Sequence, residues 1–178
     1  MRWLWYFIIY SFIGFLLEVA FARAIRSPKR DRKCFLLLPL CPVYGLGALG
    51  ILAVGGLLGR WPLLVALAGG GAATAAEYAM GLLYQRVLGV EFWDYAGLPF
   101  NVGGKVCLPF SAAWSVLSLV LVYLVHPLTE ALVARIPAGL TPAAAIFLLT
   151  DGAFTCWLLK TTGSTDSLKW YEGILPSR

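Results

Sequence analysis

Two acidic residues, Glu18 and Glu77, lie inside long apolar stretches of the sequence, at 3–24 and 61–84. An ionisable side chain at membrane depth is energetically costly, and carboxylates in such positions commonly serve as proton or ion sites. Glu18 is the sixteenth residue of its stretch, and Glu77 is the seventeenth of its own. If both stretches are helices that cross in the same direction, the rise of about 1.5 Å per residue places the two carboxyl groups at the same depth.

Small residues occupy the helix faces that carry these two acids. Gly14 precedes Glu18 by one turn, and Thr74 and Gly81 flank Glu77 at helical spacing. Because small residues let helices approach closely, both carboxyl groups are predicted to point into a helix bundle rather than at lipid. The alternative is a purely structural role, in which each acid only bonds to a neighbouring hydroxyl or backbone group.

Two other segments are predicted to bring polar side chains to the same depth. The stretch "PLCPVYGLG" at 39–47 and the stretch "WDYAGLPFNVGGKVCLPF" at 93–110 both combine glycine and proline with polar and aromatic residues. We interpret the second stretch as a loop that folds back onto the bundle; the alternative is an ordinary loop with an aromatic belt. The predicted substrate-binding or ion-binding residues are therefore Glu18, Glu77, Asp94, Asn101, Tyr44, Tyr95, Cys41 and Cys107.

The sequence lacks the motifs of metal, cofactor and nucleotide chemistry. The four cysteines show no CxxC spacing, and the single histidine, His126, stands at the end of an apolar stretch. We therefore expect no metal, and buried apolar thiols instead. Walker A, GxSxG, HExxH and dinucleotide-binding patterns are missing as well. No catalytic residue and no cofactor is assigned, and ATP hydrolysis would require a separate subunit.

The composition is that of an integral membrane protein. Of the 178 residues, 60% are hydrophobic and 13% are charged, whereas soluble domains carry roughly a quarter charged residues. The net charge of +5 would suggest nucleic acid as the partner of a soluble protein. In a membrane protein, Lys and Arg instead report the topology. We therefore expect membrane lipids, and no nucleic acid, as partners.

The apolar stretches predict an all-α fold, an integral membrane bundle of about five transmembrane helices, because a spanning helix needs about 20 apolar residues. We expect a single domain, 1–178, with a loosely ordered polar tail at 161–178. Prolines predict a broken start of the second helix, the loop 93–110 is expected to be partly re-entrant, and 126–139 is interpreted as a short interfacial helix. The predicted spans are Trp3–Ala24, Phe35–Gly59, Trp61–Tyr84, Leu108–Val125 and Leu140–Leu159.

Basic residues predict the orientation of these spans, because Lys and Arg gather on the cytoplasmic side of a membrane. The block "RAIRSPKRDRK" lies between the first two spans. With this block inside, the N-terminus is outside, the C-terminus is cytoplasmic and both acids lie near the cytoplasmic leaflet. The outer side then holds Arg2, Arg60 and Arg135, and the inner side holds Arg23, Arg26, Lys29, Arg30, Arg32, Lys33, Arg86, Lys105, Lys160, Lys169 and Arg178.

Five blocks of the sequence carry a resemblance to a known family. The blocks are "YFIIYSFIGFLLEV" (6–19), "LCPVYGLGAL" (40–49), "EYAMGLL" (77–83), "FWDYAGLPFNVGGKVCL" (92–108) and "LVHPLTE" (124–130). In this order they resemble the putative ABC-transporter type IV proteins, which are small multi-span proteins of the bacterial inner membrane, often described as permease-like. The matching positions include all eight candidate site residues. The chain departs from the family pattern at Phe15, where a Trp is usual, and at "DRKCFLLLPL" (31–40), which replaces a stretch like "NRGFLxGP".

Three functions are compatible with these features. The resemblance favours a permease-like transport component with an intramembrane carboxylate site for a cation or small polar solute, completed by a separate ATPase subunit or by a homo-oligomer. The second is a membrane-embedded enzyme for a lipid or lipid-linked substrate, with the acids in acid–base chemistry and Cys41 or Cys107 as the nucleophile. The third is a non-catalytic membrane assembly subunit, whose polar layer only fixes helix packing.

Overall fold

The computed structural model describes residues 1–27 and 33–170, and these are helical apart from connections and one isolated β-bridge. The all-α expectation is therefore confirmed. Several helices continue into one another through short π-helical turns. The elements are α1 (Arg2–Ala24), α2 (Pro42–Leu58), α3 (Pro62–Leu64), η1 (Val65–Gly69), α4 (Gly70–Leu83), η2 (Tyr84–Leu88), α5 (Leu108–Val120), η3 (Leu121–Val125), α6 (His126–Val133), α7 (Leu140–Thr162) and the 3₁₀ helix η4 (Thr165–Leu168).

Four continuous helices are long and apolar enough to cross a membrane. They are Arg2–Ala24, Pro62–Leu88, Leu108–Val133 and Leu140–Thr162, with 23 to 27 residues each. The fifth predicted span corresponds to α2, which is apolar but has 17 residues. At about 1.5 Å per residue, 17 residues reach about 25 Å, slightly less than the hydrocarbon core of about 30 Å. The protein is thus a multi-pass membrane protein with four long apolar helices and a fifth, shorter one.

The second span begins later than predicted. The stretch 35–41 is not helical, and α2 starts at Pro42. Proline is well tolerated at the first helical position, because a backbone N–H there would have no partner within the helix. The Asp151 carboxylate of α7 accepts hydrogen bonds from the backbone N–H groups of Leu37 and Leu38 at 2.8–3.2 Å. Because lipid offers no such partner, α7 stabilises this non-helical entry to α2.

The segment interpreted as a separate interfacial helix is instead the last part of a long helix. α5 continues through η3 into α6 without a break, which gives one helix of 26 residues, Leu108–Val133. Pro127 is accommodated because it stands in the first turn of α6, directly after a π-helical turn. The connection between this helix and α7 is short, from Ala134 to Gly139.

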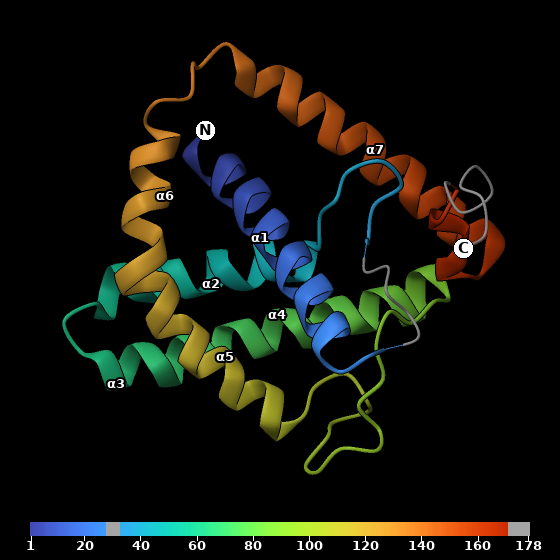
Figure 1. The fold of residues 1–178 in the computed structure, drawn as a ribbon, viewed down its shortest axis with the longest axis horizontal. Helices are drawn as coiled ribbons and strands as arrows, with labels where there is room; N and C mark the ends of the chain where they lie inside the picture. The colour runs from blue at the N-terminus through green and yellow to red at the C-terminus, as the bar shows by residue number, and fades with distance from the viewer. Residues whose placement is uncertain (28–32, 171–178) are drawn as a thin grey trace.

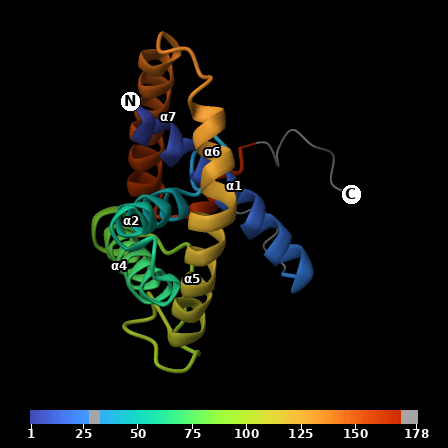
Figure 2. The same cartoon turned by 90° about the vertical axis from the view of Figure 1, so that its left-hand side faces the viewer.

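The helices pack as neighbours in the order α1, α2, α4 and α5. α2 and α4 lie side by side, α1 crosses α2, and α5 packs against α4 (Figure 1). From the side, α5 and α6 form one continuous rod next to the paired α2 and α4 (Figure 2). The described part of the polar tail contains η4, whose Leu168 is 1% exposed and packs with Tyr84 and Leu88. Lys29, Arg30, Arg32 and Arg178 of the topology prediction lie outside the described residues.

Helix ends that the topology argument assigns to one side of the membrane also meet in space. On the side assigned to the exterior, the Trp5 indole donates to Thr141 at the start of α7 at 3.1 Å, and the Tyr123 hydroxyl donates to the Gly59 carbonyl at the end of α2 at 2.9 Å. On the other side, the end of α1, part of α4, the beginnings of α2 and α5, and the 3₁₀ helix η4 after α7 surround one cavity. The fold therefore gathers residues of α1, α2, α4 and α5 and the segment that follows α7 at one place.

Candidate functional site

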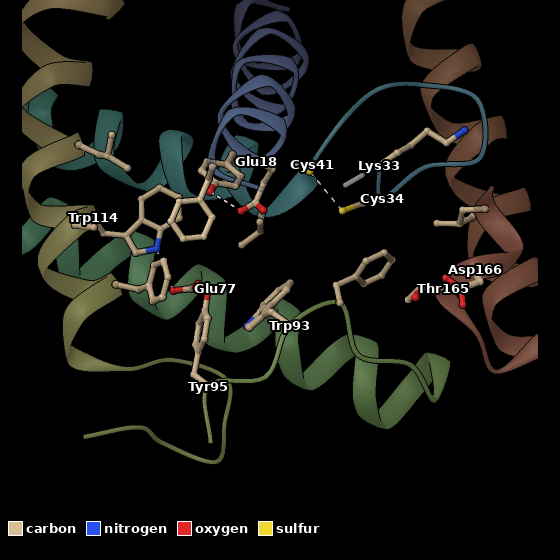
Figure 3. A pocket seen from close by; sticks show the side chains of 18 of the residues that line it. Glu18, Lys33, Cys34, Cys41, Glu77, Trp93, Tyr95, Trp114, Thr165 and Asp166 are labelled. Atoms are coloured by element: carbon tan, nitrogen blue, oxygen red, sulfur yellow. Dashed lines mark hydrogen bonds between the residues drawn. The ribbon is translucent and has the colours of Figure 1, made fainter. Parts of the chain in front are cut away.

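A cavity of about 170 Å³ lies between α1, α2, α4, α5 and η4. One water molecule needs about 10–15 Å³ of such space, so the cavity is large enough for a small solute. Figure 3 shows Glu18, Glu77, Tyr95 and Trp114 on one side of it, and Lys33, Thr165 and Asp166 on the other. The two cysteines Cys34 and Cys41 lie between the two sides. Charge is thus divided along the cavity, with an acidic and aromatic end and an end that carries lysines.

Glu18 is paired with a tyrosine from the neighbouring helix. The Tyr44 hydroxyl donates to Glu18 Oε1 at 2.7 Å. This geometry depends on Gly14, because a Cβ atom at that position would collide with the Tyr44 ring. The ring therefore crosses α1 one turn before Glu18, and its hydroxyl reaches the carboxylate of the next turn. Gly14 therefore leaves room for the Tyr44 ring, whose hydroxyl binds Glu18.

Glu77 is buried and bonded at both carboxylate oxygens. Its side chain is 5% exposed. Tyr95 of the loop donates to Oε1 at 3.0 Å, and the indole N–H of Trp114 on α5 donates to Oε2 at 3.0 Å. Hydrogen bonds from neutral donors to a carboxylate stabilise its charged form. Three chain segments that are distant in sequence thus converge on one acid.

Trp114 is a site residue that the sequence reasoning did not identify. Its ring packs over Gly47 and Ala73, and its centroid lies 5.2 Å from that of Tyr44. It therefore connects Glu77 with the Glu18–Tyr44 pair. The signal in the sequence is the indole itself, since a tryptophan N–H inside an apolar span needs an acceptor and the acids are the strongest acceptors at that depth.

Tyr95 brings the loop onto the site. Its ring stacks on Phe110 at the start of α5, with centroids 4.7 Å apart and an interplanar angle of 13°. Burial raises the pKa of the Tyr95 phenol well above its ordinary value, and the negative charge of Glu77 raises this pKa further. The phenol therefore stays protonated over the physiological range and acts as a hydrogen-bond donor to Glu77.

Cys41 also lines the cavity and stands directly before α2. It is 2% exposed, and its Sγ atom lies 3.5 Å from that of Cys34. Its backbone N–H donates to the Ser11 carbonyl of α1 at 3.0 Å, which joins the start of α2 to the helix that carries Glu18. The described residues contain no group of three or more His, Cys, Asp or Glu side chains that could hold a metal ion.

The far end of the cavity carries two lysines. Lys33 Nζ donates to the Leu36 carbonyl at 2.6 Å. Lys169, directly after η4, forms an ion pair of 3.0 Å with Asp166 of η4. Both lysines line the cavity. From the sequence, these two lysines are assigned only to the topology, because their position at the cavity depends on how the segments before α2 and after α7 fold back.

The remaining predicted site residues shape the loop. Asp94 Oδ1 accepts the Ala96 N–H at 2.8 Å, and Asn101 donates to the Leu98 carbonyl at 2.9 Å. Gly103 and Gly104 form the turn after Asn101 with φ angles of 58° and 69°, a region that glycine adopts at no steric cost. Cys107 is 1% exposed and precedes α5. None of Asp94, Asn101 and Cys107 is among the residues that line the cavity.

An ion pair between a buried lysine and a partly exposed glutamate closes the base of this loop. Lys105 is 5% exposed and its Nζ atom lies 2.8 Å from Glu91 Oε1. The lysine stem packs across Gly81, where a Cβ atom would come within 2.9 Å of it. The Trp93 indole donates to the Lys105 carbonyl at 2.8 Å. Gly81 therefore leaves room for the Lys105 side chain. The loop, packed against α4 in this way, places Tyr95 next to Glu77.

Comparisons with known proteins give one match. A family model described as "Putative ABC-transporter type IV" matches residues 5–157. The matched range contains α1 through most of α7 and includes both Glu18 and Glu77. No curated protein and no solved structure gives a significant match to the chain.

Proposed function

The chain belongs to the putative ABC-transporter type IV family, and from this membership we propose that it is a permease-like transport component for a cation or small polar solute. The bound solute would sit at an intramembrane carboxylate site near the cytoplasmic leaflet. Glu18, Glu77, Tyr44, Tyr95 and Cys41 would line this site, while Asp94, Asn101 and Cys107 would set the shape of the loop and of the start of α5.

One observation carries this proposal: two carboxylates from different helices face the same cavity. Glu18 belongs to α1 and Glu77 to α4, and both line the cavity. Carboxylates at membrane depth commonly serve as proton or ion sites. The phenols and the indole bonded to them are neutral donors, so these three hydrogen bonds leave the negative charge of the carboxylates in place. A cationic solute is therefore the preferred ligand.

The surroundings of the site suit a path rather than a closed pocket. The entry to α2 is non-helical and is held by α7, and interrupted helices commonly frame transporter binding sites. With the N-terminus outside, the cavity faces the cytoplasmic side, and the loop 93–110 would partly re-enter the bundle there through Tyr95. Five apolar segments are few for a complete path, so a separate ATPase subunit or a homo-oligomer would complete it.

Charge movement in proteoliposomes tests this proposal. Solid-supported-membrane recording detects displacement of any cationic solute, and a panel of protons, Na⁺, K⁺ and small amines would be applied to the reconstituted protein. We expect Glu77→Gln and Glu18→Gln to abolish the transient currents of the transported cation. The matched control is Glu130→Gln, because Glu130 on α6 has a side chain that is 56% exposed and lies outside the cavity.

The same preparation separates the alternative functions. Unchanged currents in both cavity variants would contradict the transport proposal. A lipid whose mass changes in the presence of the protein, and no longer changes with Glu77→Gln, would identify a membrane-embedded enzyme instead. Loss of a stable complex in native mass spectrometry, without any effect on currents or lipids, would identify an assembly subunit.

A further inference from the structure

Resting on the proposed transport function, we propose that the solute is a small organic ammonium ion, either quaternary or a protonated amine. The ion would lie between the Glu18 and Glu77 carboxylates. Aromatic rings would form the walls around it.

The aromatic walls consist of two groups of rings that line the cavity. On one side, the Tyr44 and Trp114 rings lie 5.2 Å apart at an interplanar angle of 50°. On the other side, Tyr95 stacks on Phe110 at 4.7 Å, and Phe21 of α1 meets Phe110 edge to face at 6.2 Å. All five of these residues line the cavity that also contains both carboxylates. Aromatic rings thus form a large part of the surface around the acids.

Aromatic surface around acids selects for an organic cation. The negative face of a ring attracts a cation, and cages of such rings recognise quaternary ammonium groups. Mg²⁺, Ca²⁺ and similar ions instead require about six or more oxygen ligands. Here both Glu77 oxygens and one Glu18 oxygen already accept hydrogen bonds, and rings occupy the remaining wall. An alkylammonium ion is held by charge and ring contacts together and does not require that oxygen shell.

The opposite end of the cavity orients such a ligand. That end combines Lys33 with the ion pair of Lys169 and Asp166, whereas the other end carries two carboxylates. A positive charge is therefore attracted toward Glu18 and Glu77. The cavity volume of about 170 Å³ is below the 300–1,000 Å³ of typical drug-sized sites. A cation with only a few carbon atoms is therefore the size class that fits.

Calorimetric titration of the full protein in nanodiscs tests this substrate class with four compounds. Choline and tetramethylammonium carry the proposed group, 3,3-dimethylbutan-1-ol has the shape of choline without its charge, and KCl supplies a simple metal cation. We expect both ammonium ions to bind, the neutral alcohol and K⁺ to bind at least tenfold more weakly, and Glu77→Gln to remove ammonium binding.

Removing rings separates the aromatic contribution from that of the carboxylates. Phe110→Leu keeps the apolar volume and should weaken choline binding roughly 2- to 30-fold, the range of a lost cation–π contact. Phe21→Leu removes another ring of the same wall and provides the measurement if Phe110→Leu does not fold. The matched control is Phe147→Leu, because Phe147 on α7 is 51% exposed and lies outside the cavity; choline binding should be unchanged there.

The outcomes distinguish this inference from the function on which it rests. Equal binding of choline and its neutral isostere, or full retention of choline binding in both ring variants, would overturn the ammonium proposal. Glu77-dependent currents of protons or K⁺ that choline does not inhibit would also overturn it, yet would leave the transport proposal standing. Absence of ammonium binding together with absence of Glu77-dependent current would overturn both.

Discussion

The Asp151 carboxylate in the middle of α7 accepts the backbone N–H of Leu38 at 2.8 Å. Asp151 is 3% exposed and also accepts the N–H of Leu37. One turn later, Thr155 accepts the N–H of Leu36 at 2.8 Å. A transmembrane helix thus supplies the acceptors that a non-helical segment lacks, and α7 is attached to the bundle through the entry of α2.

We therefore expect Asp151→Ala to destabilise the protein by roughly 1.5–3 kcal/mol, the range for hydrogen bonds to a charged group whose donors are left buried. Asp151→Asn should cost less, because its carbonyl oxygen still accepts one bond. Thermal unfolding in detergent measures both variants, and Glu130→Ala on the exposed side of α6 is the control. Equal stability of Asp151→Ala and the parent protein would show that these bonds do not hold the segment.

Close packing of α1 and α2 is the basis of the Glu18–Tyr44 pair. A Cβ atom at Gly45 would collide with Ser11 and with the Phe7 carbonyl of α1. Gly45→Ala should therefore separate the two helices and cost roughly 1–3 kcal/mol, as overpacked interfaces do. Because Tyr44 is the preceding residue, its hydrogen bond to Glu18 should be lost as well.

Gly56→Ala is the matched control for this prediction, since it lies in the same helix and a Cβ atom there meets nothing within 4 Å. Thermal unfolding should show a lowered midpoint for Gly45→Ala alone. A normal midpoint with Gly45→Ala, or an equal loss with Gly56→Ala, would contradict the close approach of α1 and α2.

The sequence predicts those properties of the site that depend on local backbone geometry. It does not predict those that depend on how helices pack against one another. The similar positions of Glu18 and Glu77 along their helices could be predicted because the helical rise is fixed for every residue. The contacts of Trp114 could not, because they depend on how α5 is rotated against α4. The role of Asp151 could not be predicted either, because its partners are backbone groups of 35–41, a segment whose hydropathy predicts helix. Apolar composition alone does not show where a helix begins.

The loop illustrates the same limit. Gly103 and Gly104 predicted a turn correctly, since a positive φ is a local requirement. The role of Asp94 was less apparent, because a carboxylate that caps its own loop and one that binds a solute have the same sequence signature. Tyr95 and Asp94 are adjacent in sequence, yet one lines the cavity and the other does not.

The proximity of Cys34 and Cys41 predicts a selective cross-link. Their Sγ atoms are 3.5 Å apart, and a small movement brings them to the disulfide length of about 2.05 Å. Diamide takes two electrons and two protons from the two thiols and becomes the hydrazine, so we expect an intramolecular disulfide across 34–41. Peptide mapping under non-reducing conditions would identify it. A disulfide that joins Cys34 or Cys41 to another cysteine would contradict this arrangement.

Whether the 17-residue α2 crosses the membrane decides on which side the cavity opens. Single cysteines introduced into a cysteine-free variant report this through a membrane-impermeant maleimide. Ser27→Cys follows α1, Gly97→Cys lies in the loop before α5 and Gly139→Cys precedes α7. A Cβ atom at Gly97 or Gly139 meets nothing within 4 Å, so both substitutions should be tolerated.

With five crossings and the N-terminus outside, Ser27→Cys and Gly97→Cys should be protected in intact cells and labelled after permeabilisation, and Gly139→Cys should be labelled from outside. If α2 does not cross, Gly97→Cys and Ser27→Cys must react from opposite faces, because only the helix Pro62–Leu88 then crosses between them. That pattern would place the loop with Tyr95 on the face opposite to the end of α1. Tyr95 and Glu18 line one cavity, so we expect Ser27→Cys and Gly97→Cys to be labelled from the same face. Labelling from opposite faces would contradict the five-crossing topology.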